Sequence, residues 1–388
     1  MPEDKIFSFY YGQKGIIPLA LVFFDGLYKF FCTIEGKKGI YLSTSADLVS
    51  FEDTNLFLDV SAVGGASAFV KNDKIYFFFS DKRGVIRSAS LDRTGNIIEY
   101  PLPMVNKKGL FDPKVFYDSN KFFLLCCSLK GTVFLYESEN LFDFIYFNSC
   151  QVPNNSSLCC PSMQKIGDEW VLIYEEKGWI YFHKAHIDLT NKEFFLKEEK
   201  ELLDKVSSPR IATLLDGRTI MACISHKSLV FREIWTKDGS IFLFPLSEME
   251  ARKVIKDNFE VNDTKKAQVE LFETKNISVE LKLSSMSKNK TLICFSENTT
   301  YPEYLWINTE EKNLVLSTGK QKAEISRREY YEETPELVIF FINDVIEVYF
   351  KKIGLVISSS NPYQSSQKAK IKILSETQMS PKIAVFSL

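Results

Sequence analysis

Few residues of this chain have side chains that could do chemistry, and one of them is a lone carboxylate. Asp112 lies in the segment Gly109–Tyr117, GLFDPKVFY, directly before a proline and an apolar run. Two adjacent cysteines, Cys159 and Cys160, precede another proline and a similar run. A carboxylate can donate a proton or stabilise positive charge, and a thiolate can act as a nucleophile. Hydrolysis of a glycosidic bond, by contrast, needs two carboxylates about 5–10 Å apart.

The histidines and the basic residues add little to this set. His183 and His186 stand three residues apart in the run WIYFHKAH, and residues i and i+3 of a strand face opposite sides of a sheet. The chain has no CxxC pair and no Cys/His spacing suited to zinc, so we expect neither a metal nor a cofactor. Arg210 and Lys114 each follow a proline and could together hold an anion, although basic residues at such positions are usually solvated.

Composition places the chain among ordinary globular proteins. Its 388 residues are 45% hydrophobic, which is enough for one or two sizeable cores, and its formal net charge is −2. Lys and Arg are spread along the sequence without a basic block, which argues against nucleic acid as a partner. The longest nearly apolar run, residues 16–24, is too short to span a bilayer, and the N-terminus lacks a signal-type apolar core. We therefore expect a cytoplasmic protein with reduced thiols and no membrane partner.

A repeat of near-constant period organises the first 245 residues. Five times, a short apolar run leads through a turn into a second, aromatic run, which is the pattern of a β-hairpin. The second turn residue of each copy serves as a marker: Gly26, Asp73, Asn120, Asp168 and Gly217. The successive spacings are 47, 47, 48 and 49 residues. Four strands in each copy, repeated five times, predict a five-bladed β-propeller, and a large irregular sandwich is the alternative.

The sequence repeat ends after Leu246. Residues 247–256, SEMEARKVIK, can form a short helix, and short alternating runs follow to the end of the chain without the earlier period. Many short strands at a spacing of 8–12 residues predict a β-sandwich. We therefore expect an all-β protein with a propeller over residues 1–250 and a sandwich over residues 251–388.

The expected propeller would bring the starts of its five inner strands together around one mouth of the central channel. Asp112 is the only acid among these positions, so the ring offers one carboxylate where a propeller glycosidase needs two. The residues at these strand starts are Ile17, Gly64, Asp112, Cys159 with Cys160, and Ser207 with Ser208.

At these residues the chain resembles glycoside hydrolase family 32, the group of invertases, levanases and sucrose-6-phosphate hydrolases. KGLFDPKVFY is similar to the family's F-R-D-P-K-V-F, SADLVSFED to its S-x-D-L-V-x-W-E, and SLCCPSMQKI to its Y-E-C-P-D-L-F. LLDGRTIMAC, LVFREIWTKDGSIFLF and LVIFFINDVIEVYF resemble three later family segments in the same order. The resemblance covers nearly the whole chain and implies a propeller followed by a sandwich.

The chain departs from the family pattern where the family places its catalytic groups. By the resemblance, Ile17 stands at the position of the nucleophile and Cys159 at that of the acid/base. Ser162 replaces the Asp of the E-C-P-D segment, and Phe111 replaces the Arg of R-D-P. Asp112 alone survives of the three family carboxylates.

These departures predict a family 32-like protein without fructoside hydrolysis, which binds a sugar or fructan or pairs with itself or an active homologous partner. The expected ligand contacts are Asp112, Phe111, Cys159, Ser162 and Arg210. Two alternatives stay open. One is an active carbohydrate enzyme, of the fructosidase or sucrose-6-phosphate hydrolase type or phosphorolytic, that uses Asp112 with a non-standard second group. The other is an assembly protein whose channel is plugged by Ile17 and Phe111.

Overall fold

The computed structural model describes residues 8–9, 14–52, 54–61, 63–152, 158–166, 169–214, 216–237, 240–260, 264–271, 277–282, 290–294, 304–308, 313–318, 321–326, 336–343, 345–352, 354–360, 369–379 and 382–387. By its internal contacts the chain divides into two compact units. The first consists mainly of Gly15–Ile224 and Leu229–Ile241, and the second mainly of Ser225–Ser228 and Phe242–Leu388. The boundary near residue 250 stays a prediction about domain organisation.

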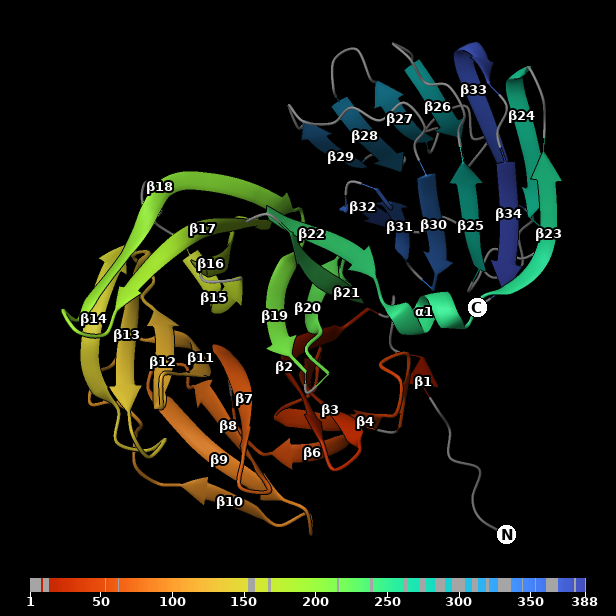
Figure 1. Ribbon diagram of the computed structural model, residues 1–388. Coiled ribbons are helices and arrows are strands. Elements are labelled where there is room, and N and C mark those ends of the chain that lie inside the picture. The colour runs from red at the N-terminus through yellow and green to blue at the C-terminus, as the bar shows by residue number, and fades with distance from the viewer. Residues whose placement is uncertain are drawn as a thin grey trace, which may run out of the picture. The chain divides into compact units, whose positions relative to one another are not determined.

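Five antiparallel sheets form the first unit (Figure 1). In the first sheet the order is β1-β5-β4-β3-β2, with β6 paired to β4, and the other four sheets have four strands each. The strands are β1 (Ser8–Phe9), β2 (Ile16–Phe24), β3 (Leu27–Ile34), β4 (Ile40–Ser45), β5 (Ser50–Phe51), β6 (Asn55–Leu58), β7 (Gly65–Lys71), β8 (Lys74–Ser80), β9 (Ile86–Asp92), β10 (Ile97–Tyr100), β11 (Phe111–Asp118), β12 (Lys121–Cys127), β13 (Thr132–Ser138), β14 (Ile145–Gln151), β15 (Leu158–Ile166), β16 (Glu169–Glu176), β17 (Trp179–Asp188), β18 (Glu193–Asp204), β19 (Ser207–Thr213), β20 (Thr219–Ser225), β21 (Ser228–Lys237) and β22 (Ser240–Pro245).

The first strands of the five sheets close into a ring. β2 lies beside β7, β7 beside β11, β11 beside β15, β15 beside β19, and β19 returns to β2. The second to fifth sheets extend outward from the inner strand by consecutive hairpins, and in the first sheet β5 and β6 both pair with β4 while β1 pairs with β5 (Figure 1). The five sheets and the closed ring of their first strands have the arrangement predicted for a five-bladed propeller.

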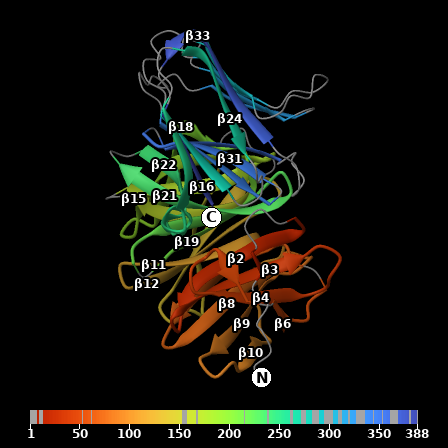
Figure 2. The ribbon, with the colours of Figure 1, turned by 90° about the vertical axis from the view of Figure 1, so that its right-hand side faces the viewer.

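Aromatic side chains fill the spaces between blades and explain the repeated phenylalanine-rich runs. Phe31 of β3 and Phe77 of β8 meet between the first and second blades, with ring centroids 4.8 Å apart, and Figure 2 shows these two sheets beside each other. Phe116 of β11 and Trp170 of β16 meet between the third and fourth blades at 5.0 Å. Strands in the middle of a blade are covered on both faces, so they are apolar in nearly every position instead of alternating.

A side-chain-capped turn recurs in the outer part of the blades. Asp47 Oδ1 accepts hydrogen bonds from the backbone N–H groups two and three residues further on, at 3.0 and 2.8 Å. Asn140 Oδ1 does the same in the third blade, at 2.9 Å for both. The next residues, Leu48 and Leu141, adopt φ angles of 59° and 80° and are fully buried. The segments SADL and SENL are therefore conformational signals, in which a short polar side chain replaces backbone partners.

The second unit holds two antiparallel six-stranded sheets, which confirms the predicted sandwich. Their orders are β23-β34-β25-β30-β31-β32 and β24-β33-β26-β27-β28-β29. The helix expected over residues 247–256 is α1 (Ser247–Ala251) only, because the β-branched pair Val254–Ile255 starts β23, which pairs with β34. Among the described residues no helix has both the length and the apolar character of a membrane span. The strands are β23 (Val254–Glu260), β24 (Thr264–Leu271), β25 (Ile277–Lys282), β26 (Lys290–Cys294), β27 (Tyr304–Asn308), β28 (Asn313–Thr318), β29 (Gln321–Ser326), β30 (Glu336–Ile342), β31 (Val345–Phe350), β32 (Leu355–Ser360), β33 (Ala369–Met379) and β34 (Lys382–Ser387).

Candidate functional site

The inner strands of the third, fourth and fifth blades begin with the same backbone kink. Asp112, Cys160 and Ser208 each stand directly before a proline and have φ angles of 50°, 54° and 53°. At each of these points the pairing with the next strand shifts register. A left-handed φ costs an L-residue about 1–2 kcal/mol, and short polar side chains tolerate it best. The kink makes Asp112, Cys160 and Ser208 equivalent positions around the channel.

A buried ion pair occupies the centre of these strand starts. Arg210 donates from Nη2 to Asp112 Oδ1 at 2.9 Å, and its Nε donates to the carbonyl oxygen of Pro18 at 3.3 Å. The second carboxylate oxygen, Asp112 Oδ2, accepts the backbone N–H of Cys160 at 3.1 Å. The two side chains are only 5% (Asp112) and 12% (Arg210) exposed. These contacts join the first, third, fourth and fifth blades through one carboxylate and one guanidinium.

The charge balance of this centre follows from its burial. Burial by itself would lower the pKa of the Arg210 guanidinium, but the charge of the Asp112 carboxylate and its hydrogen bond with Arg210 contribute to raising it above its ordinary value. Arg210 is therefore a permanent cation, and its charge is balanced in place by the Asp112 carboxylate. Such a pair is costly to break from one side, because the remaining charge is then left buried without a partner.

The second blade contributes the space that the carboxylate needs. Gly65 has a φ angle of 142°, and a Cβ atom on it would lie 1.8 Å from Asp112 Oδ1. The preceding Gly64 is close to Phe111 in the same way, since a Cβ there would lie 2.9 Å from the ring atom Cδ1. All five blades thus help to position Asp112, and the second blade does so because Gly65 has no side chain that would occupy the place of the carboxylate.

Two adjacent thiols lie next to the ion pair. A hydrogen bond with Cys159, together with burial, raises the pKa of the Cys160 thiol well above its ordinary value. Cys160 therefore stays protonated at neutral pH and is a poor nucleophile and a poor metal ligand. Cys159 is partly buried, and its Sγ lies 3.8 Å from the backbone oxygen of Glu175. Cys159 and Cys160 are free thiols, as are the five other cysteines whose side chains the structure describes.

Glu175 is a second acid near the centre, and the sequence reasoning missed it. It pairs directly with Cys159 across the β15–β16 hairpin, and its Oε2 accepts the backbone N–H of Ser208 at 2.6 Å. One of its carboxylate oxygens and the Sγ atoms of Cys159 and Cys160 all lie within 4.8 Å of one another. These three groups have the donor types of a soft-metal site, but the protonated Cys160 and the nearby positive charge of Arg210 oppose a cation there.

The structure brings only part of the predicted site together. Asp112 and Arg210 are in direct contact, whereas the side chain of Ile17 is 43% exposed. Phe111 packs against the core between the third and fourth blades. Ser162 is buried, and its Oγ accepts a hydrogen bond from Gln164 Nε2 at 3.1 Å. The space just past the ion pair, lined in part by Arg210 and Ser162, measures about 20 Å³, which is room for about one water molecule.

Comparison with known proteins supports the fold. No protein-family model matches the sequence, and no curated protein sequence matches it. Among solved structures, a sucrose-6-phosphate hydrolase from Lactobacillus gasseri superposes with a TM-score of 0.75 at 16% identity, over 98% of this chain and 93% of that one. A GH32 β-fructofuranosidase from Bombyx mori gives 0.79 at 14% identity, over 99% and 94%. An exo-inulinase from Aspergillus awamori gives 0.79 at 13% identity, over 98% of both chains. At these identities the likeness shows a fold of the GH32 type and nothing more.

Proposed function

We propose that this protein keeps the GH32-type fold without fructoside hydrolysis and acts by binding, with a carbohydrate or a protein partner as its ligand. The observation that carries the proposal is that the Asp112 carboxylate is buried and hydrogen-bonded to the protein through both oxygens. Its two oxygens accept hydrogen bonds from Arg210 and from the Cys160 amide, and its side chain is 5% exposed. Each oxygen of this carboxylate already accepts a hydrogen bond from the protein, and little of the side chain is open to a substrate.

The chemistry of fructoside hydrolysis makes the same point. The reaction passes through a transition state with oxocarbenium character, so the sugar ring carries positive charge that carboxylates must stabilise. Here the Arg210 guanidinium lies against the carboxylate and cancels its charge. Ile17, at the position where the resemblance places the nucleophile, has no atom that can attack a sugar carbon.

Glu175 favours a second candidate, an enzyme with a relocated acid. Its cross-strand pairing with Cys159 puts a carboxylate beside the position that the resemblance assigns to the acid/base. Such an enzyme would still lack a nucleophile from the chain, so an external one such as inorganic phosphate would have to attack. It would also require Arg210 to leave Asp112, which the buried ion pair opposes.

The test assays wild type, Asp112→Asn and Glu175→Gln on sucrose, sucrose 6-phosphate and short fructans, with and without inorganic phosphate, by chromatography of the products. We expect no turnover above a protein-free control in any reaction. Turnover by wild type on the order of 1 per second that both substitutions abolish would refute the proposal and establish the Glu175 enzyme. A glycan and sugar-phosphate binding screen, run beside light scattering for oligomeric state, then distinguishes a carbohydrate ligand from a protein partner.

A further inference from the structure

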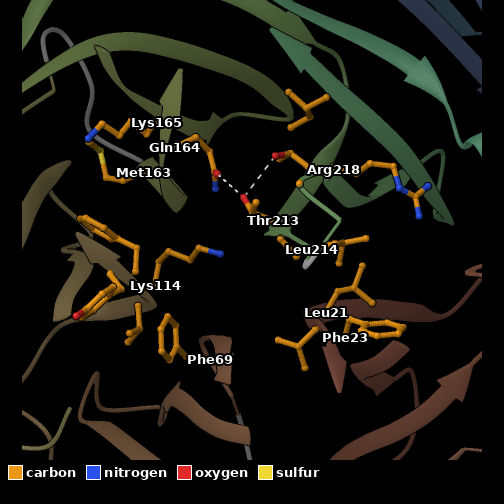
Figure 3. Close-up of a pocket in the computed structure, with 18 of the residues that line it drawn as sticks. Leu21, Phe23, Phe69, Lys114, Met163, Gln164, Lys165, Thr213, Leu214 and Arg218 are labelled. Carbon is orange, nitrogen blue, oxygen red and sulfur yellow. Dashed lines mark hydrogen bonds between the residues drawn. The ribbon is translucent and has the colours of Figure 1, made fainter. Parts of the chain in front are cut away.

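The other ends of the five inner strands surround a large cavity in the propeller (Figure 3). It measures about 910 Å³, within the range of small-molecule sites in proteins. Every inner strand contributes to its wall, and the strand starts with Asp112 do not. The cavity is therefore distinct from the ion-pair centre, and its ligand does not depend on whether the protein hydrolyses fructosides.

Lys114 of β11 points into this cavity (Figure 3). Its ammonium group donates one hydrogen bond, to the backbone oxygen of Ile211, and no acidic side chain of the described chain pairs with it. An ammonium group has three N–H donors, so two of them have no protein acceptor among those residues. Burial, and to a smaller extent the positive charge of Arg210, together lower the pKa of Lys114 to about 8. Lys114 is thus still mostly a cation at pH 7.

The other charged side chains that line the cavity balance one another. Lys165 pairs with Asp118 at 3.3 Å, and Arg218 pairs with Asp216 at 2.7 Å. Arg218 also reaches Glu233 at 3.2 Å. Among the described lining residues, Lys114 is therefore the charge for which the protein supplies no counter-ion.

The remaining wall is mainly apolar with one polar edge. Leu21 and Phe23 of the first blade and Phe69 of the second face the cavity, as Figure 3 shows. On the side of the fourth and fifth blades, Thr213 Oγ1 donates to Gln164 Oε1 at 3.2 Å. A ligand that fits this wall has an apolar body, one anionic group and room for one or two further hydrogen bonds.

We propose that the cavity binds a small organic anion, whose oxyanion group pairs with the Lys114 ammonium and whose apolar body lies against Leu21, Phe23 and Phe69. The anion would supply the negative charge that Lys114 lacks among the described residues, and it would accept hydrogen bonds from the two N–H groups of the ammonium that have no protein acceptor there. Hydrogen bonds between charged groups in a site of this kind are stronger than neutral ones. A carboxylate and a phosphate ester share this chemistry, and the test distinguishes them.

The direct test titrates the purified protein with 1-anilinonaphthalene-8-sulfonate and with its uncharged counterpart N-phenyl-1-naphthylamine, by fluorescence. Wild type should bind one sulfonate molecule per chain, and Lys114→Met should weaken that binding at least tenfold while leaving the uncharged probe within twofold. The matched control is Lys197→Met, an exposed lysine outside the cavity that pairs with Glu169, and it should change neither affinity. Equal affinity of wild type and Lys114→Met for the sulfonate would overturn the proposal.

A second measurement uses wild type alone and so does not depend on the variant folding. Because Lys114 loses its charge as the pH rises through its pKa of about 8, sulfonate affinity should be constant below pH 7 and fall above pH 8. The uncharged probe should show no such change, and parallel curves for the two probes would refute the role of Lys114. Displacement of the sulfonate by 2-naphthoate or by 2-naphthyl phosphate identifies the preferred oxyanion, whereas equal displacement by 2-naphthol would contradict anion recognition.

Discussion

Replacement of Arg210 by methionine removes one half of the central ion pair and keeps a side chain of similar length. The guanidinium makes a charged hydrogen bond to Asp112 at 2.9 Å and a second one to the Pro18 carbonyl at 3.3 Å. Hydrogen bonds to charged groups contribute about 1.5–3 kcal/mol each, and breaking a buried pair from one side typically costs about 3–5 kcal/mol. Because Asp112 is buried and Gly65 leaves it no other position, we expect a loss of about 3–5 kcal/mol in the free energy of unfolding.

The assay is unfolding in guanidinium chloride, followed by tryptophan fluorescence in a Trp306→Phe background. Trp170, Trp179 and Trp235 then report on the first unit alone, since Trp306 is the only tryptophan of the second. The control is Lys197→Met, which breaks an exposed pair with Glu169 and should cost less than about 1 kcal/mol.

A double-mutant cycle separates the ion pair from general packing. Asp112→Asn alone leaves Arg210 buried without its counter-charge and should also be destabilising. The double variant Arg210→Met/Asp112→Asn should be more stable than the sum of the two single effects implies, by about 2 kcal/mol or more, because it leaves no lone charge. An Arg210→Met variant within 1 kcal/mol of wild type, or purely additive effects, would refute the ion-pair reasoning.

Three further outcomes follow from the same geometry. Gly65→Ala should destabilise the first unit by several kcal/mol in the same denaturation assay, because its Cβ would lie 1.8 Å from Asp112 Oδ1; a loss below about 1 kcal/mol would contradict this. Burial alone would raise the pKa of Glu137, but hydrogen bonds from two lysines lower it overall, so its contribution to stability is present above about pH 4.5 and lost as the pH falls through its folded pKa. Wild type should therefore lose stability on acidification more steeply than Glu137→Gln, and identical pH profiles would exclude the effect. Cys160, whose thiol stays protonated, should resist iodoacetamide in the native protein at pH 7 and react only after denaturation, as peptide mass spectrometry would show.

The architecture was predictable because its signals are local. A few residues encode a hairpin turn, and Asp25–Gly26 and Ser119–Asn120 adopt the positive φ angles that their turns need; the marker Asp168 lies outside the described residues. Five copies at a near-constant spacing then leave a closed ring as the simplest way to cover every blade on both faces. The helix was predicted too long, because pairing of β23 with β34 outweighs a weak helical preference at Val254 and Ile255.

The sequence pointed to Asp112 and Arg210, but it revealed neither their pairing nor the nearby Glu175. The sequence suggested that Arg210 could hold an anion, and the anion it holds is Asp112, which lies 98 residues earlier. That contact depends on how two inner strands meet across the channel and on the kink before each proline, neither of which a turn period reveals. In the sequence, Glu175 looks like part of a solvated acidic end of a strand. The register of the β15–β16 hairpin, counted from its turn, nevertheless places Glu175 opposite Cys159.

The charges of Asp112, Arg210 and Lys114 inside the channel bear on both the proposed function and the proposed anion site. A glycosidase must surround a cationic transition state with free carboxylates. In this channel the carboxylate of Asp112 is already neutralised by Arg210, and Lys114, which lines both the small space beside the ion pair and the large cavity, adds a positive charge without a counter-ion. At an effective dielectric constant of about 20, the repulsion between two positive unit charges 4 Å apart is about 4 kcal/mol. The positive charge of Lys114 therefore bears on both proposals: it disfavours a cationic transition state in the small space beside the ion pair, and it favours an anion in the large cavity.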